Sequence, residues 1–185
     1  MIAHGAEATE MKLSARNLSS AEMEKVTLDR ADLSYAALDG ARLVCVSLRG
    51  ANLANGSAYE AKFLSCHFEG VDAFLFKLRA TQFDRCDFTG ANLMRSVWTQ
   101  CTVTNCNFTG ADLRNARFDE ALFVDCDLRE ADLSVPEPGI NTARGARFVR
   151  CDLRGSKWTS RDLDGVQFSS CQLDGSGLDP GTVRG

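Results

Sequence analysis

The sequence predicts an all-β solenoid, a chain wound into a coil by repetition. Large apolar residues recur at every fifth position in one phase from Leu13 to Leu178, with few gaps. A period of five matches neither the 3.6 residues of a helical turn nor the two-residue alternation of a strand. It indicates that the chain bends once per five residues and points one large side chain inward each time.

A small residue stands two places before most of these large ones. Ala fills this place in Ala91-Asn92-Leu93, and Cys fills it in Cys151-Asp152-Leu153. Only a small side chain can share a narrow interior with Leu or Phe from the same short segment. The pattern resembles the pentapeptide-repeat family, whose consensus is A(D/N)LXX, over roughly residues 13 to 178. The resemblance implies a right-handed quadrilateral β-helix with four repeats per coil.

The coil length can be tested by stacking the sequence in steps of twenty. This sorts Asp and Asn, Leu and Phe, Cys, and Gly into separate columns, which a period of five alone would not do. We therefore expect about eight coils, which at ~4.8 Å each make a rod of roughly 40 Å. The acidic column comprises Asp32, Asn52, Asp72, Asn92, Asp112, Asp132, Asp152 and Gln172. The aromatic column comprises Leu28, Leu48, Phe68, Phe88, Phe108, Leu128, Phe148 and Phe168.

The unbroken five-residue phase predicts a single repeat domain at 13–178. A polar lead-in at 1–12, where disorder is expected, precedes this domain, and a tail at 179–185 follows it. The phase weakens at 54–60, where Ala58 replaces a large residue, and at 134–147, which carries two of the three prolines. The second stretch is either a protruding loop or a distorted coil of unchanged length. Continuation of the acidic column at Asp152 favours the distorted coil.

Composition limits the class of protein. A net charge of −4 disfavours direct nucleic-acid binding, and no apolar run approaches the ~18 residues of a membrane span. Residues 1–15 lack the apolar core of a signal peptide. Seven of the eight cysteines occupy the small inward position, so they are expected to pack as small reduced hydrophobes in a cytoplasmic protein.

No catalytic, cofactor or metal site is expected. His4 lies in the lead-in, and His67 stands beside Cys66, where neighbouring residues of a β-coil face opposite sides of the wall. A straight ladder of cysteines inside a packed rod cannot offer four tetrahedral ligands to zinc. The sequence therefore indicates a binding protein and not an enzyme.

The acidic column is the first candidate partner surface, at Asp32, Asp72, Asp112, Asp132 and Asp152. Short acidic side chains stabilise their own turns, and regularly spaced carboxylates can also imitate duplex DNA. Some bacterial pentapeptide-repeat proteins bind type II topoisomerases and protect them from quinolones or peptide toxins. The resemblance thus implies DNA gyrase or topoisomerase IV as partner, in resistance or self-protection. Those relatives dimerise end to end through a hydrophobic C-terminal module, often a helix, whereas DGSGLDPGTVRG here contains no amphipathic helix. This departure argues against a long dimeric rod, and the sequence leaves both a monomer and a dimer open.

The second candidate surface is apolar. Phe74 and Leu75 stand at positions that normally face solvent, and Met94 lies one coil above Phe74. They form either an exposed partner site or a local bulge that turns Phe74 inward in place of Ala73. An apolar site would favour the alternative function, a structural or adaptor module of a larger bacterial assembly. A continuous negative face would favour DNA mimicry, and a mixed face with one apolar patch would favour the adaptor.

Overall fold

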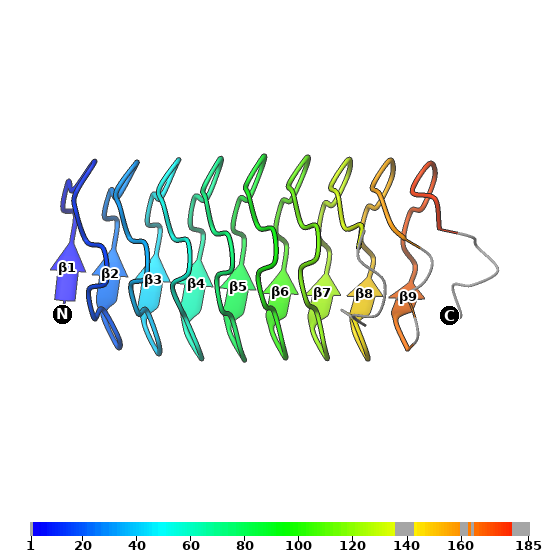
Figure 1. Ribbon diagram of the computed structural model, residues 1–185, viewed down its shortest axis with the longest axis horizontal. Helices are drawn as coiled ribbons and strands as arrows, with labels where there is room; N and C mark the ends of the chain where they lie inside the picture. Colours follow the sequence, from blue (N-terminus) through cyan, green and yellow to red (C-terminus); the bar gives the residue numbers. More distant parts are fainter. Residues whose placement is uncertain (1, 136–142, 160–162, 164, 179–185) are drawn as a thin grey trace.

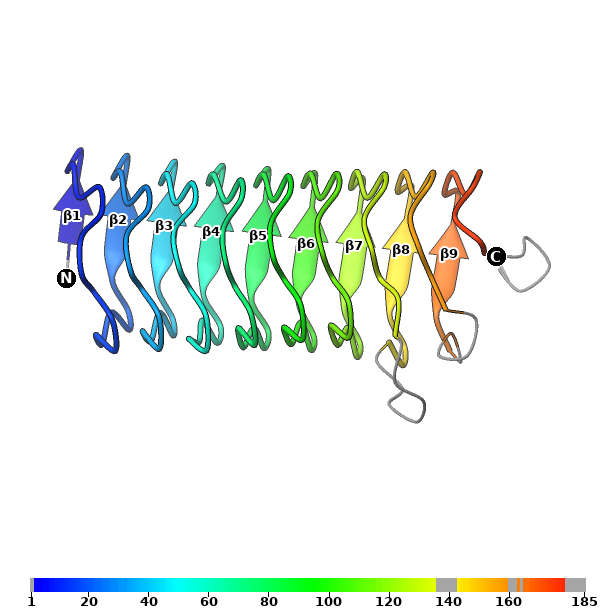
Figure 2. The same cartoon turned by 45° about the horizontal axis from the view of Figure 1, so that its top comes forward.

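The computed structural model is a parallel β-solenoid whose successive coils lie side by side along one axis (Figure 1; Figure 2). It describes residues 2–135, 143–159, 163 and 165–178. One nine-stranded sheet holds the strands in chain order, each paired in parallel with the next. The predicted fold class is therefore confirmed, and the described residues contain no helix. The strands are β1 (Ile2–His4), β2 (Glu22–Glu24), β3 (Arg42–Val44), β4 (Lys62–Leu64), β5 (Gln82–Asp84), β6 (Thr102–Thr104), β7 (Leu122–Val124), β8 (Arg147–Val149) and β9 (Gln167–Ser169).

The other three walls of each coil are held by single parallel bridges. Asp72 pairs with Asn92 and Asn92 with Asp112, so the predicted acidic column stacks directly over these coils. The chain turns each corner through a residue in the left-handed region, such as Glu60 (φ 57°) or Gly90 (φ 62°). Glycine adopts this conformation without steric cost, which explains the glycine column at these corners.

The irregular stretch at 134–147 corrects the predicted register. Strand β6 pairs with β7 at an offset of 20 residues (Thr102 with Leu122), but β7 pairs with β8 at an offset of 25 (Leu122 with Arg147). The distorted coil of unchanged length is therefore wrong, because this coil contains five extra residues. Residues 136–142 themselves lie outside the described part of the chain.

The insertion moves Asp152, Gln172, Phe148 and Phe168 out of their predicted columns. Asp152 stacks on Asp127, and Lys157 takes the place above Asp132. Phe148 likewise pairs with Phe123 and not with the column of Leu128. An insertion of one whole repeat preserves the five-residue phase, and the neighbouring columns also carry Asp and Phe. The sequence pattern therefore could not reveal the shift.

The predicted lead-in at 1–12 is also corrected, because its described residues belong to the solenoid. Strand β1 pairs with β2 through Ala3 and Met23, and Lys12 bridges to Asp32. These residues form the first coil of the ladder. At the other end Leu178 is buried, and the predicted tail at 179–185 lies outside the described residues.

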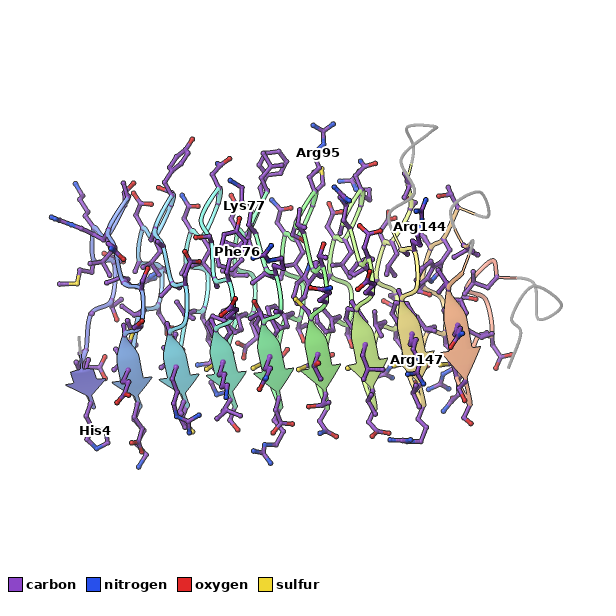
Figure 3. All side chains as sticks on the ribbon, turned by 90° about the horizontal axis from the view of Figure 1, so that it is seen from below. His4, Phe76, Lys77, Arg95, Arg144 and Arg147 are labelled. Atoms are coloured by element: carbon purple, nitrogen blue, oxygen red, sulfur yellow. The ribbon has the colours of Figure 1, made fainter. Side chains whose placement is uncertain are left out.

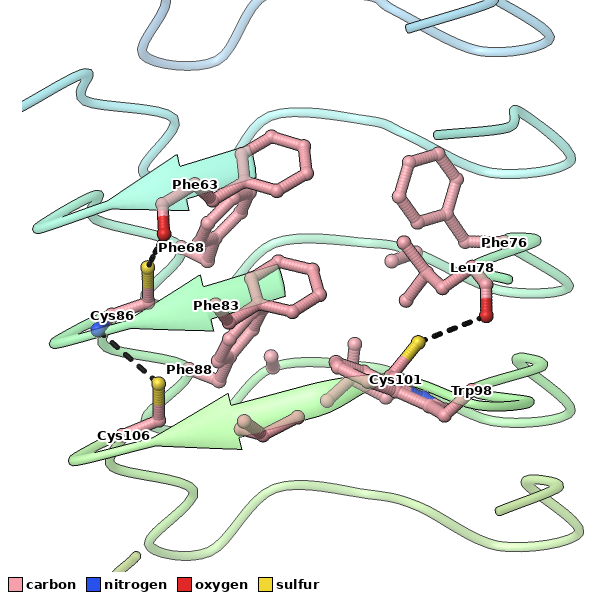
Figure 4. Close-up of a cluster of buried hydrophobic side chains, with 14 of the residues drawn as sticks. Phe63, Phe68, Phe76, Leu78, Phe83, Cys86, Phe88, Trp98, Cys101 and Cys106 are labelled. Carbon is pink, nitrogen blue, oxygen red and sulfur yellow. Dashed lines mark hydrogen bonds between the residues drawn. The ribbon is translucent and has the colours of Figure 1, made fainter. Parts of the chain in front are cut away.

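Stacked aromatic rings fill the interior of the middle coils. The ring centroids of Phe68 and Phe88 lie 4.6 Å apart with nearly parallel planes (Figure 4). Those of Phe88 and Phe108 lie 4.8 Å apart in the same arrangement. Phe83 meets Phe88 edge to face at 5.4 Å. Both arrangements are favoured for aromatic pairs, so the stack from Phe68 to Phe108 ties these three coils together.

Cysteines occupy the small inward position, as predicted. Six of the eight are buried and all are free thiols. The Cys101 thiol donates a hydrogen bond to the Leu78 carbonyl oxygen at 3.0 Å, and the Cys86 thiol donates to that of Phe63 at 3.5 Å (Figure 4). Burial raises the pKa of Cys101 to about 12. These thiols therefore act as small packing residues with weak donors, not as thiolate nucleophiles.

The weak phase at 54–60 has a packing explanation. Ala58 is buried at the place of a large residue, and Gly56 occupies the small position beside it. One coil later Phe76 is buried at a position that elsewhere holds a small residue. A Cβ added to Gly56 would lie 3.0 Å from Cε2 of Phe76, so the ring packs against the glycine. The large residue missing from one coil is thus supplied by the next.

Candidate protein-interaction surface

The acidic column stabilises the corners of its own coils. The Oδ1 atom of Asp32 accepts a hydrogen bond from the Ser34 backbone N–H at 3.0 Å, and Asp132 accepts one from Ser134 at the same distance. Asn52 does the same for the N–H of Ala54. A short side chain that satisfies a backbone donor two residues on is a common turn device. These contacts support the structural interpretation of the column.

Arginines neutralise part of this charge. Arg114 binds Asp112 through two hydrogen bonds, Nε to Oδ1 at 2.9 Å and Nη2 to Oδ2 at 2.6 Å. Arg154 binds Asp152 in the same way at 2.9 and 2.5 Å. Asp127 and Arg129 repeat this pairing. These pairs were not predicted, although the recurring triplet Asp-Leu-Arg is a visible signal of them in the sequence.

The column is also bounded by cations. Lys12 stands one coil before Asp32 and Lys157 one coil after Asp132. Asp152, predicted for this column, lies on the neighbouring wall. Over the described residues the rod therefore carries a mixed face, with carboxylates paired or interrupted by basic groups, and not one continuous negative face.

The Asp–Arg pairs predict a loss of stability in acid. Hydrogen bonds from Arg114 and Arg154 hold the pKa values of Asp112 and Asp152 below the ordinary 3.8. A carboxylate with a lowered pKa in the folded state contributes stability above its unfolded pKa and loses it as the pH falls through its folded pKa. We expect the melting temperature to be flat above about pH 5 and to fall below about pH 4.

The matched test removes one pair. Arg154→Gln is expected to leave a shallower fall in melting temperature between about pH 4 and pH 2, because the carboxylate loses its charged partner. Arg16→Gln, at a site with no ion pair among the described contacts, serves as control. An acid transition that is identical in all three proteins would contradict the role of these pairs.

The apolar candidate residues lie at one corner of the rod in regular register. Ala73 and Phe76 are buried, Phe74 and Met94 are half-buried, and Leu75 is 37% exposed. The Leu75 backbone N–H donates to the Met94 carbonyl oxygen at 3.1 Å, as coil-to-coil pairing requires. The proposed bulge is therefore wrong, since Ala73 keeps its inward place and Phe74 stays at the surface.

We call this surface the apolar edge. Phe74, Leu75 and Met94 form its centre, and Val97 is half-buried on the adjoining wall beside exposed Lys77. Tyr35, 65% exposed, stands two coils away at the same corner position as Leu75. Figure 3 shows Arg95 projecting outward past the ribbon, while Phe76 lies among the interior side chains. The edge thus combines exposed apolar groups with cations.

Comparison with known families agrees with this geometry. A model of the pentapeptide repeat region matches residues 96–178, and a model of eight copies of the pentapeptide repeat matches residues 12–43. The chain belongs to the pentapeptide-repeat family. A comparison with curated protein sequences found no match.

Solved structures of other pentapeptide-repeat proteins show the same fold. A trypsin-treated variant of QnrB1, a plasmid-mediated fluoroquinolone resistance protein, superposes with a TM-score of 0.69 at 20% identity, over 93% of this chain and 82% of that one. HetL, involved in heterocyst differentiation regulation in the cyanobacterium Nostoc sp. strain PCC 7120, gives a TM-score of 0.51 at 20% identity, over 95% and 88%. At this identity the likeness establishes the fold alone.

The described residues contain no helix that is long and apolar enough to cross a membrane. They also bring together no group of three or more His, Cys, Asp or Glu side chains that could hold a metal ion.

Proposed function

We propose that the chain is a non-enzymatic binding protein that docks the surface of its rod on a protein partner. The main support for this proposal is the exposure of two large apolar side chains, Tyr35 at 65% and Leu75 at 37%. Both adopt left-handed backbone angles, φ 59° and 57°, which cost a residue other than glycine roughly 1–2 kcal/mol. The left-handed angle recurs at the corners all along the rod, so the feature that sets these two residues apart is the exposure of large apolar side chains to water. A binding role explains their presence, because exposed apolar groups mark interaction sites.

A type II topoisomerase, DNA gyrase or topoisomerase IV, is the most specific candidate partner. The likeness to QnrB1, a fluoroquinolone resistance protein, spans nearly the whole rod and supports this choice by analogy of fold. The activity would then be resistance or self-protection in a bacterial cell. The buried free thiols fit a reducing cytoplasm.

The net charge of the chain is too small for its rod to imitate duplex DNA, and this favours contact through the apolar edge. Duplex DNA carries one charge per ~1.7 Å, so a rod of ~40 Å would need about 24 negative charges to match it. The whole chain carries a net charge of −4. The mixed face described above also fits the second candidate, an adaptor module of a larger assembly, which would use the same edge.

A gyrase supercoiling assay with and without a quinolone tests the partner. We expect the protein to change supercoiling or to relieve quinolone inhibition. Leu75→Asn should weaken this effect, because asparagine tolerates the left-handed backbone but removes the apolar group. The double variant Asp72→Asn, Asp132→Asn is the matched control, since Asn52 and Asn92 already hold the same turn through their amide oxygens.

The two surfaces give opposite outcomes. Loss of the effect in the Asp variant with retention in Leu75→Asn would favour DNA mimicry over docking through the edge. Indifference of the enzyme to the wild-type protein in both conditions would exclude gyrase as partner and leave the adaptor function.

A further inference from the structure

The first coil, at the β1 end of the nine-stranded sheet, turns backbone hydrogen-bonding groups away from the rod. One coil later, the Thr27 N–H donates to the Ala6 carbonyl oxygen at 2.8 Å, and the Thr27 carbonyl oxygen accepts from the Ala8 N–H at 2.7 Å. Both backbone groups of Thr27 thus point at the first coil. Glu7 stands below Thr27 in the same bridge position, and Lys12 occupies that position on the next wall. Their N–H and C=O groups therefore point off the end of the rod, as at the edge of a sheet that can accept another strand.

A large side chain also projects from this end. Met11 occupies the small inward position that holds Ala31 one coil later, and it is 49% exposed. A side chain at a small inward position reaches toward the preceding coil, as the Cys106 sulfur does when it accepts a hydrogen bond from the Cys86 N–H at 3.3 Å (Figure 4). A regular coil in front of Met11 would leave only the space of an alanine or a cysteine. Met11 therefore extends beyond the first coil and blocks a further regular one.

The same coil lacks side-chain volume beside Met11. Ala3 and Ala8 hold the large inward positions that Met23 and Leu28 fill one coil later, and both alanines are only half-buried. The end of the rod thus combines one extra apolar side chain with two missing ones. We call this surface the end face, made of Ala3, Glu7, Ala8, Met11 and Lys12.

A second copy of the chain can pair with the end face through its own first coil. A two-fold axis across the rod brings the two coils together with antiparallel walls, in which opposite residues exchange two hydrogen bonds. A coil with four walls offers four such axes. Two of them would place Glu7 on Glu7 or Lys12 on Lys12, and a third would pair neither charge. The fourth places Glu7 of each copy opposite Lys12 of the other, which is the favourable cross-strand pair.

The axis that pairs the charges also matches the side-chain volumes. Met11 precedes Lys12 and Ala8 follows Glu7, so the antiparallel register sets Met11 of one copy opposite Ala8 of the other. Both charged residues are exposed, and the described contact of the Glu7 carboxylate is one hydrogen bond from the Thr27 hydroxyl at 3.2 Å. Arg16 falls opposite Ala3 next to a corner, where its stem can lie along the wall while its guanidinium stays in water.

We propose that the end face binds a second copy of this chain head to head, through antiparallel pairing of the two first coils. Charge complementarity between Glu7 and Lys12 sets the axis, and Met11 fills the volume that Ala8 leaves. The dimer would present the apolar edge twice on one longer rod, so a partner with two sites would bind it with higher avidity. This inference does not depend on the identity of that partner.

Sedimentation velocity of the full chain over a concentration series tests the proposal, with small-angle X-ray scattering to measure the shape. The variants are Glu7→Lys, Lys12→Glu and Met11→Gln, which keeps the length of the side chain but makes it polar. Glu22→Lys is the matched control, because Glu22 is an exposed glutamate on β2, one coil away from the end. An unchanged melting temperature establishes that each variant is folded.

We expect the wild type and Glu22→Lys to form a concentration-dependent dimer about twice as long as the monomer, since stacked coils extend the rod along its axis. Glu7→Lys and Lys12→Glu should each self-associate at least tenfold more weakly, because like charges then face each other at both contacts. Met11→Gln should also weaken the dimer. A mixture of Glu7→Lys with Lys12→Glu should recover it, because every contact between these two variants again joins a lysine to a glutamate.

Three results would each overturn the proposal. The first is a wild-type protein that stays monomeric at every concentration. The second is a dimer of unchanged length, which would mean that the rods lie side by side. The third is a dimer that tolerates both charge reversals, or a mixture of the two variants that stays monomeric.

Discussion

Replacing Trp98 with alanine is expected to lower the free energy of unfolding by about 3–5 kcal/mol. The indole is fully buried, and its centroid lies 5.2 Å from that of Phe83 and 5.8 Å from that of Phe108. Its Nε1–H donates to the Ser96 hydroxyl oxygen at 2.7 Å. Alanine would remove these contacts and leave a cavity that rings fixed by stacking cannot readily fill.

Trp158 provides the matched control. It repeats the same local arrangement, with Nε1–H donating to the Ser156 hydroxyl at 2.9 Å, but it is only partly buried and lies near the end of the ladder. Trp158→Ala is therefore expected to cost about half as much, since less apolar area leaves water. Urea denaturation followed by far-UV circular dichroism gives both values. Equal losses would contradict the prediction that the deeper burial of Trp98 makes it the larger contributor to stability.

The sequence predicted the fold because its physical requirement repeats. Each five-residue repeat must place a large side chain such as Leu93 inward and a small one such as Ala91 beside it, and thirty-odd repetitions make that requirement visible. The register across 134–147 could not be predicted, because an insertion of one repeat leaves the phase unchanged. Only pairing between coils, such as Asp132 with Lys157, distinguishes the two registers.

The candidate surface was predicted less completely, for a related reason. Phe74, Leu75 and Met94 break the repeat and were visible as exceptions. The partners of long side chains depend on which rotamers reach which neighbours, so the arginine that neutralises Asp112 was not evident from its column. The buried Phe76 was also unexpected, because its place is set by a glycine one coil earlier.

Gly56 and Phe76 should therefore behave as a coupled pair. A Cβ at position 56 would lie 3.0 Å from Cε2 of Phe76 and 2.8 Å from the Ala36 carbonyl oxygen. Gly56→Ala is expected to cost about 1–3 kcal/mol by overpacking. Phe76→Ala is expected to cost about 3–5 kcal/mol, since it empties the space that Gly56 and Ala58 leave.

The double variant Gly56→Ala, Phe76→Ala should cost less than the sum of the two single changes by at least about 0.5 kcal/mol. Removing the ring relieves one of the two close contacts, while the contact with the Ala36 carbonyl remains. Urea denaturation of all four proteins measures the coupling. Gly90→Ala with Phe76→Ala is the matched cycle, because a Cβ at Gly90 meets nothing within 4 Å, and it should be additive. Additive costs in both cycles would mean that Phe76 fills its place independently of Gly56, and the exchange of volume between coils would then be wrong.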